Sequence, residues 1–289
     1  ATAAYLNGDG HAELIIVGEW MPVTILSWAN GRLNDVTSDY IKEETSGWWS
    51  AVTADDLDGD GDQDLIVGNI GENYKFKASA DKPFQVYADD FDHNGTNDIF
   101  LARYLTDSML VPIRGRECSS QQMPVLAEKF PTFRDFANSD LHGILGDGIR
   151  QAVTRKATLF SSIIMVNDGG KLRSRRLPVD VQVSVINSFV IDDFDGDGVK
   201  DILIAGNKFD TEVETTPADG SPGFFMKGMG NLQYRPVKSE ESGFFAPYNV
   251  KDMRMLKSVH GNTIVVSSNN DKLRTFAVRR VGQGTVAVK

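Results

Sequence analysis

Residues 56–69 read DLDGDGDQDLIVGN, an aspartate-rich loop that runs directly into a short apolar segment. The loop follows the nine-residue pattern Asp-x-Asp-x-Asp/Asn-Gly-x-x-Asp. The same pattern recurs in full at residues 90–98 (DFDHNGTND) and 193–201 (DFDGDGVKD), and an incomplete copy, YLNGDGHAE, occupies residues 5–13. One aspartate-glycine turn is common in any protein, but three full copies in one chain indicate a structural repeat.

A short apolar segment follows every copy of the loop. These segments are residues 14–18 (LIIVG), 65–69 (LIVGN), 99–102 (IFLA) and 202–207 (ILIAGN). They are too short for helices and are rich in aliphatic and β-branched side chains, which favours buried strands. The repeat therefore predicts a loop that joins two β-strands.

The loop chemistry points to a bound cation. Carboxylates packed into nine residues repel one another unless a cation lies among them. Side chains at positions 1, 3 and 5 can converge, the glycine at position 6 permits a sharp turn, and position 7 offers a main-chain carbonyl. Because all these ligands are oxygens, a hard cation is expected, and Ca²⁺ tolerates this crowded shell better than Mg²⁺ does. Position 12 is Val67, Leu101 or Ile204, where an EF-hand has glutamate.

Three calcium sites are predicted from the full loops. Their ligands are Asp56, Asp58, Asp60, Asp62 and Asp64 in the first, Asp90, Asp92, Asn94, Thr96 and Asp98 in the second, and Asp193, Asp195, Asp197, Val199 and Asp201 in the third. Position 7 in each set contributes its carbonyl oxygen. The incomplete copy has Asn7, Asp9 and Glu13, but Tyr5 cannot supply the first carboxylate, so metal there is expected to be weak or absent.

A second repeated signal suggests a fifth unit near the C-terminus. Ser-Gly-Trp-Trp at 46–49 precedes Asp56, and Ser-Gly-Phe-Phe at 242–245 precedes Asp252 at the same spacing. Asp252 is therefore expected to begin a further copy of the loop, in which Arg254 has replaced the second aspartate. The paired aromatic residues are expected to pack in the core rather than to form sugar-stacking platforms.

The spacing of the units predicts the architecture. Loop starts at Tyr5, Asp56, Asp90, Asp193 and Asp252 are separated by 51, 34, 103 and 59 residues. Repeats of this length, each with a few short strands, are typical of propeller blades. The fold expected is all-β and propeller-like, with about five recognisable units that either close a ring or belong to a seven-bladed one.

The 103-residue interval must contain an insertion. Apolar residues recur at helical spacing there, namely Leu141, Ile144, Leu145, Ile149 and Val153. We therefore expect blades at residues 1–116, a helical insertion at 117–160 and further blades at 161–289, all in one domain. The N-terminal residues lead straight into the first repeat, so we expect the chain to be a piece of a longer exported precursor.

Composition narrows the possible functions. Thirty Lys and Arg against 40 Asp and Glu give a net charge of −10, which disfavours nucleic-acid binding. Cys118 is the single cysteine, so an intrachain disulfide is excluded. The sequence contains neither an apolar run of transmembrane length nor a Gly-x-Ser-x-Gly or His-Glu-x-x-His motif. No catalytic residue is therefore predicted.

The aspartate loops, with the apolar strands that follow them, resemble the FG-GAP/VCBS repeats of integrin-α-like β-propellers. The segments at 18–22, 47–49, 68–73 and 121–124 are also similar to bacterial exported relatives of cartilage acidic protein, which often carry an ASPIC/UnbV label. The resemblance implies calcium within the blades, at the loop residues named above. It also implies a scaffold for adhesion or for contact with protein or glycan, rather than a reaction.

Together these observations predict a secreted or cell-surface, outer-membrane-associated binding protein. Loops of this type suit the millimolar Ca²⁺ found outside cells. The partner expected is an extracellular protein or polysaccharide. The alternative is a propeller-type polysaccharide lyase or hydrolase, which needs a convergent cluster of Lys, Arg, His or Tyr side chains at the mouth of the propeller.

Overall fold

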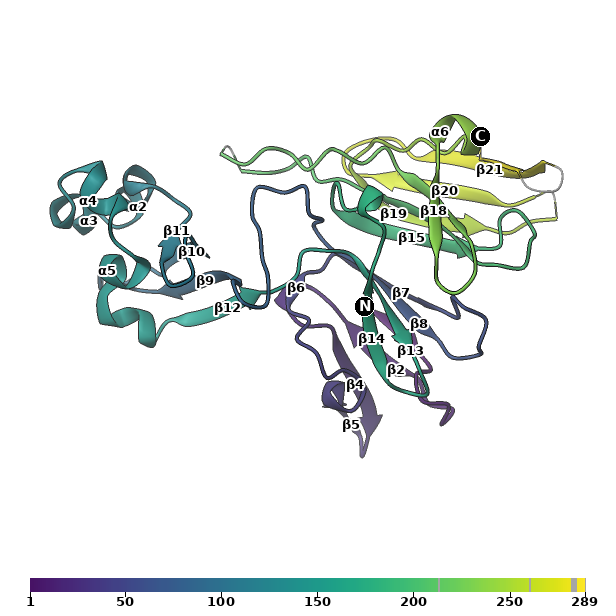
Figure 1. Ribbon diagram of the computed structural model, residues 1–289, viewed down its shortest axis with the longest axis horizontal. Helices are drawn as coiled ribbons and strands as arrows, with labels where there is room; N and C mark the ends of the chain where they lie inside the picture. The colour runs from purple at the N-terminus through teal and green to yellow at the C-terminus, as the bar shows by residue number, and fades with distance from the viewer. Residues whose placement is uncertain (213, 260, 282–284, 289) are drawn as a thin grey trace. The chain divides into compact units, whose positions relative to one another are not determined.

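The computed structural model describes residues 1–212, 214–259, 261–281 and 285–288 (Figure 1). Over these residues the chain forms five four-stranded antiparallel sheets and a few short helices. The predicted all-β, propeller-like fold class is confirmed, and each of the five predicted units contributes one sheet. No helix in the described part of the chain has the length and apolar character needed to cross a membrane.

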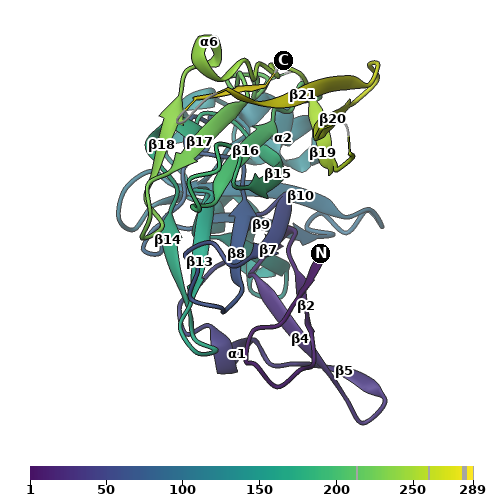
Figure 2. The same ribbon diagram turned by 90° about the vertical axis from the view of Figure 1, so that its right-hand side faces the viewer.

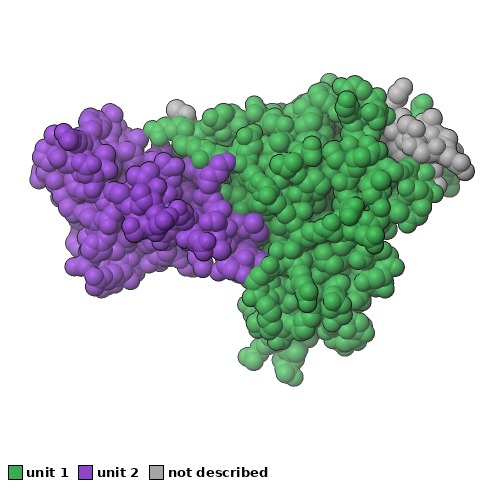
Figure 3. Space-filling model, viewed as in Figure 1, with its two compact units in different colours: residues 1–43, 48–75, 160–289 green, residues 44–47, 76–159 purple. Residues whose placement is uncertain are grey.

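The chain divides into two compact units (Figure 3). Unit 1 comprises residues 1–43, 48–75 and 160–289, and unit 2 comprises residues 44–47 and 76–159. Four of the five sheets belong to unit 1. The fifth sheet and most of the helices belong to unit 2.

Within unit 1 every sheet takes its four strands in chain order (Figures 1 and 2). The first sheet contains β1 (Thr2–Ala4), β2 (Glu13–Ile16), β4 (Thr24–Ala29) and β5 (Arg32–Asp35). The second contains β7 (Ala51–Asp55), β8 (Asp64–Gly68), β13 (Ile163–Asn167) and β14 (Leu172–Arg176). The third contains β15 (Ile186–Asp192), β16 (Asp201–Gly206), β17 (Phe224–Gly228) and β18 (Tyr234–Val237). The fourth contains β19 (Val250–Leu256), β20 (Thr263–Ser268), β21 (Arg274–Val281) and β22 (Thr285–Val288).

Short elements connect these sheets. They are β3 (Glu19–Met21), α1 (Thr37–Tyr40), β6 (Gly47–Trp48), the 3₁₀ turn η2 (Val179–Val181) and α6 (Ser239–Ser242). None of them exceeds four residues, so packing between sheets, rather than helices, holds unit 1 together.

The aspartate loops join the first and second strands of their sheets, as the repeat predicts. Asp55 pairs with Asp64 across β7 and β8, and Asp192 pairs with Asp201 across β15 and β16. The ninth loop residue is therefore also the first residue of the second strand. Strands β8 and β16 are buried along their whole length, which explains why their sequences are continuous apolar runs rather than alternating ones.

Neighbouring sheets of unit 1 meet through their first strands. Strand β1 contacts β7, β7 contacts β15, and β15 contacts β19. One core lies between the second and third sheets and includes Ile164, Ile186 and Ile202. Another lies between the third and fourth sheets and includes Leu203 and Phe244. This succession of first strands is the packing that makes the fold propeller-like.

Unit 2 combines one sheet with a group of short helices. Its strands, in spatial order, are β12 (Val153–Ala157), β9 (Phe84–Asp89), β10 (Asp98–Tyr104) and β11 (Leu110–Pro112). Its helices are α2 (Arg116–Gln122), α3 (Val125–Lys129), α4 (Phe133–Ala137), α5 (Leu141–Leu145) and the 3₁₀ helix η1 (Gly146–Arg150). Phe100 from the sheet and Met123, Leu126 and Leu141 from the helices share one core.

The inserted segment differs from the expected 117–160 in extent and in structure. The residues between β8 and β13, the second and third strands of one sheet, include all of 76–159 and therefore the second aspartate loop. Helices occupy residues 116–150 of this segment, but Val153, expected on the helical face, begins strand β12. The helix ends because Gly146 adopts a φ of +70°, and β12 then pairs with the free edge of β9.

The prediction that Asp252 begins a loop is wrong. Asp252 lies inside β19, which continues to Leu256, and β20 begins at Thr263. Strand β7 starts three residues after Trp48, whereas β19 starts six residues after Phe244. Asp56 and Asp252 lie at the same distance from their aromatic residues, but Asp56 therefore follows its strand and Asp252 lies inside its own. The expected core packing holds for Trp49 and Phe244, which are buried, but Phe245 is 52% exposed.

Candidate metal centres

The three full loops share one hydrogen-bond pattern around their first aspartate. Asp56 Oδ2 accepts from the N–H of Gly61 (3.2 Å), Asp90 Oδ2 from Gly95 (2.9 Å), and Asp193 Oδ2 from Gly198 (3.0 Å). Each of these position-6 glycines has a positive φ, +99°, +88° and +87° respectively, a conformation that favours glycine. The glycine of the motif is thus explained by the loop backbone.

The last aspartate of each loop is buried and closes the loop on itself. Asp64, Asp98 and Asp201 are 1%, 2% and 0% exposed. Each accepts through Oδ2 from the N–H of loop position 2, which is Leu57 (3.1 Å), Phe91 (3.2 Å) or Phe194 (3.1 Å). In unit 1 the second oxygen also accepts from the third strand of the sheet, from Asn167 N–H (2.8 Å) or Gly228 N–H (2.8 Å).

Each loop brings three carboxylates together. The clusters are Asp56, Asp58 and Asp64 in the first loop, Asp90, Asp92 and Asp98 in the second, and Asp193, Asp195 and Asp197 in the third. Within a cluster one oxygen from each residue lies within 4.8 Å of the others. These three clusters could hold a metal ion, and their oxygen-only donors fit a hard cation.

The other predicted ligands make local contacts within or beside the loops. Asp60 and Asn94 accept main-chain hydrogen bonds from residues 62 and 96 (2.9 and 2.8 Å). The side chain of Asp62 accepts from Gly169 N–H (3.1 Å). In the third loop Val199 donates its N–H to Asp197 (2.9 Å), and the buried Asp201 lies outside the cluster of three.

Burial without a cation opposes ionisation of these carboxylates. Burial, together with the nearby charges of Asp58 and Asp60, raises the pKa of Asp64 to about 6. Burial likewise raises the pKa of Asp201 to about 6 and shifts those of Asp58 and Asp98 upward. A bound divalent cation would favour the charged forms instead, so the electrostatics of the loops fit a cation site.

The third loop differs because a lysine reaches its carboxylates. Lys227, on β17, forms ion pairs with Asp195 and with Asp197 (Nζ to Oδ2 2.8 Å). Burial lowers the pKa of Lys227, but the hydrogen bonds to these two carboxylates outweigh it and leave the pKa raised. In the sheet of the first loop the corresponding strand residue, one before Asn167, is Val166. Lys227 is thus an internal counter-cation that the first loop lacks.

We expect Lys227→Met to raise the calcium affinity of the third loop by about tenfold, because a bound cation no longer competes with the ammonium group. Calcium titration calorimetry of the whole chain measures this change. Lys200→Met is the control matched for charge, since Lys200 pairs with Asp55 (3.5 Å) rather than with the loop carboxylates. Equal affinities in the two variants would contradict a counter-cation role for Lys227.

The incomplete loop at residues 5–13 is held by hydrogen bonds instead. The Asn7 amide donates to Asp9 Oδ2 (3.1 Å) and to Glu13 Oε1 (3.4 Å), and the Tyr40 hydroxyl donates to Glu13 Oε1 (2.9 Å). Burial and the hydrogen bond to Glu13 raise the pKa of Tyr40 to about 12, so the hydroxyl remains a donor. With only two carboxylates, which already accept three internal hydrogen bonds, weak or absent metal binding remains the prediction here.

Asp252, which was expected to begin a fifth loop, is bound by its neighbours. Its Oδ1 accepts from Ser188 Oγ (3.1 Å), and its Oδ2 accepts from Arg254 Nε (3.0 Å). Residues 257–259, at the start of the turn that does join β19 to β20, include no carboxylate. The site therefore has no cluster of carboxylates for a cation.

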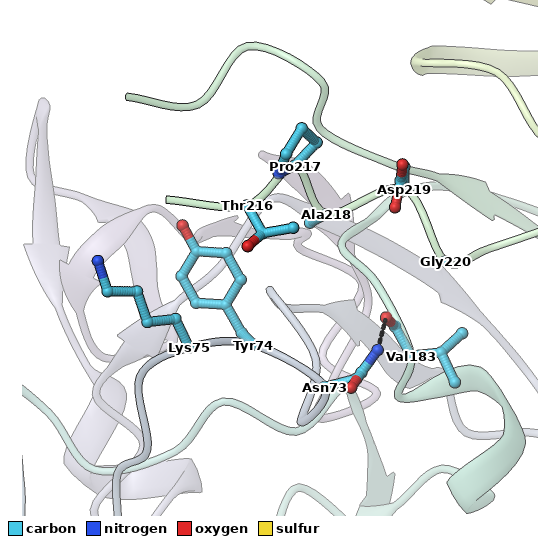
Figure 4. A pocket seen from close by; sticks show the side chains of 9 residues that line it. All are labelled: Asn73, Tyr74, Lys75, Val183, Thr216, Pro217, Ala218, Asp219 and Gly220. Atoms are coloured by element: carbon cyan, nitrogen blue, oxygen red, sulfur yellow. Dashed lines mark hydrogen bonds between the residues drawn. The ribbon is translucent and has the colours of Figure 1, made fainter. Parts of the chain in front are cut away.

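Cavities of unit 1 lie at both ends of the strands: one is lined by residues 55–59 and 198–200 of the first and third loops, and others lie at the opposite strand ends. One of these others, of about 380 Å³, is formed by the segments after β8 and before β15 and β17 (Figure 4). The Tyr74 ring lies beside Thr216 in this cavity, and Asn73 Nδ2 donates to the Val183 carbonyl (3.4 Å). Its lining comes from three distant segments with no shared motif, so the sequence carries no signal for it.

A comparison with known families supports the repeat. The family model of the FG-GAP-like repeat matches residues 6–67, which cover the first full loop and all but one residue each of the incomplete loop and of strand β8. None of the curated proteins matches the chain significantly. The loops, the strands that they join and this match agree that residues 6–67 contain an FG-GAP-like repeat.

Proposed function

We propose that the chain is a calcium-stabilised binding scaffold of the bacterial cell exterior that contacts protein or polysaccharide. The observation that carries the proposal is the threefold recurrence of one oxygen-only carboxylate cluster between the same two strands of a sheet. Calcium suits such a crowded, flexible shell of oxygen ligands better than magnesium does. Loops with moderate affinity are filled at the millimolar Ca²⁺ of an extracellular medium, which supports the location.

The scaffold role is supported by the way the loops are built into the fold. Asp64 and Asp201 each join a loop to the third strand of its sheet through a main-chain hydrogen bond. A cation bound by such a loop stabilises the strand pairing rather than presenting itself to a substrate. Binding energy of the ion then adds directly to the stability of the sheet.

The alternative function is a polysaccharide lyase or hydrolase. Tyr74 and Lys75 line the cavity of Figure 4, but burial raises the pKa of Tyr74, which opposes its use as a general base. Lys75 Nζ donates to the Glu214 carbonyl (2.9 Å). Formation of unsaturated uronides from acidic polysaccharides, followed by absorbance, would support the alternative over the scaffold.

We expect calcium to raise the melting temperature of the chain by several degrees. With dissociation constants of about 0.1–1 mM and about 2 mM Ca²⁺, each site adds roughly 0.6–1.8 kcal/mol, and three sites add about 2–5 kcal/mol. Thermal unfolding in EDTA, in Ca²⁺ and in Mg²⁺ measures the effect.

The triple variant Asp58→Asn, Asp92→Asn, Asp195→Asn removes one carboxylate from each cluster. It should lose the calcium-dependent rise in melting temperature and shows whether the loops cause that rise. Metal analysis of the purified chain gives an independent readout. If calcium does not raise the melting temperature and the purified chain contains no bound calcium, the proposal is wrong.

A further inference from the structure

A second cavity in unit 1 combines amides, carboxylates and aromatic rings. It has a volume of about 320 Å³ and lies where three segments meet: the loop after β16, the two residues before β19 and the turn after β20. These are the strand ends opposite to the third aspartate loop, which precedes β16. The cavity is therefore separate from the metal centres.

One carboxylate orients two amides of this cavity. Asp210 Oδ2 accepts from Asn249 Nδ2 (3.3 Å) and from Asn269 Nδ2 (3.0 Å). A carboxylate only accepts hydrogen bonds, so both NH₂ groups must face Asp210 and both amide oxygens must face away from it. The backbone supports the arrangement, because Asn269 N–H donates to the Asn249 carbonyl (2.9 Å).

Two acceptors in the cavity wall lack donors. Asn249 is 5% exposed, and within the described residues its Oδ1 has no hydrogen-bond partner. The same holds for Ser268 Oγ, at the end of β20, among the atoms that the structure describes. A buried polar atom without a partner costs roughly 1–3 kcal/mol, so a ligand hydroxyl that shifts the wall enough to donate to either oxygen recovers part of that cost.

Aromatic groups provide apolar surface next to these polar atoms. The Arg274 guanidinium lies 3.6 Å from the centre of the Tyr248 ring and pairs with Asp271 (2.8 Å), which holds the tyrosine on one face. Phe209 also lines the cavity and is 44% exposed. A ligand with both hydroxyl groups and C–H faces matches such a surface.

We propose that this cavity binds a neutral saccharide through its hydroxyl groups. Sugar hydroxyls both donate and accept, and can therefore satisfy the Asn249 and Ser268 oxygens. Asp210 and Asp271 line the cavity, and the adjacent Arg274 is already paired with Asp271, which disfavours uronic-acid and sulfated glycans. The inference rests on the proposed binding function and names the class of ligand for it.

The test is retention of the whole chain, in Ca²⁺, on immobilised neutral polysaccharides with glucose, mannose, galactose and xylose backbones. Alginate and polygalacturonate serve as the anionic arm. We expect retention on at least one neutral polymer. Asn269→Ala and Asp210→Ala should weaken it by about tenfold each, because each removes a hydrogen-bonding group or the carboxylate that orients the amides.

Asn73→Ala, an exposed asparagine at the cavity of Figure 4, is the matched control and should leave retention unchanged. Retention on the anionic polymers alone, retention unaffected by Asn269→Ala and Asp210→Ala, or no retention on any neutral polymer would overturn the inference. Melting temperatures in Ca²⁺ and EDTA, measured on the same samples, separate this failure from that of the proposed function. A calcium-stabilised chain without saccharide binding contradicts only the inference.

Discussion

Gly206→Ala is expected to destabilise unit 1 by more than about 4 kcal/mol and to leave little folded chain. A Cβ at this position would lie 1.8 Å from the Val185 carbonyl oxygen and 2.7 Å from its carbonyl carbon. Both atoms are main chain, beside the register shift where β15 pairs with β16, so neither can move without breaking the sheet. Position 206 requires glycine because the Val185 main chain leaves no space for a side chain, not because of the backbone dihedral angles at this position.

Gly18→Ala is the matched control, because Gly18 follows its apolar segment at the same place in the repeat. The nearest atom to a Cβ there is Met21 Sδ at 3.1 Å, the flexible end of a side chain, so the expected cost is below about 1 kcal/mol. All four tryptophans lie at positions 20, 28, 48 and 49, within unit 1, so their fluorescence during urea unfolding reports this unit. Similar stabilities for the two variants would contradict the steric argument.

Asp201→Ala is expected to cost about 2–6 kcal/mol even in EDTA, before any metal is considered. The substitution removes the acceptor for two buried main-chain donors, Phe194 N–H (3.1 Å) and Gly228 N–H (2.8 Å). Each donor left unpaired costs roughly 1–3 kcal/mol. Urea unfolding followed by tryptophan fluorescence measures the loss.

Asp197→Ala separates metal binding from this structural role. The Asp197 side chain is 39% exposed and pairs with Lys227, an interaction of about 0–1 kcal/mol at such exposure. In EDTA this variant should therefore be nearly as stable as the parent chain, and in Ca²⁺ it should lack only the contribution of the third site. An Asp201→Ala chain as stable in EDTA as Asp197→Ala would show that the buried carboxylate does not anchor the sheet.

The sequence by itself determined the elements that depend on neighbouring residues. The loop motif, with glycine at position 6 and a carboxylate at position 9, predicts a turn, a strand and a converging set of oxygens within about a dozen residues. Among the described residues, three such clusters and five four-stranded sheets are present. These features are readable because the groups that form them are adjacent in the chain, so residue type and spacing suffice.

The sequence repeat predicted the structure less well where one unit departs from the pattern of the others. The spacing from Phe244 led to Asp252, but hydrogen bonding aligns the strands differently and leaves that residue inside β19. The helical spacing of apolar residues wrongly predicted a helix through Val153 for a similar reason. Residues 153–157 pair with β9, and this pairing outweighs their local helical pattern. In both cases a partner distant in sequence decided the outcome.

Only the tertiary structure decided which distant residues complete each site. Lys227 reaches Asp195 across 32 residues, and Asp210 reaches Asn269 across 59. The insertion between β8 and β13 likewise depends on β8 pairing with a strand about 100 residues later. Such contacts follow from the packing of strands and sheets, whose energy depends on burial and shape rather than on any local pattern, so one sequence without its fold does not reveal them.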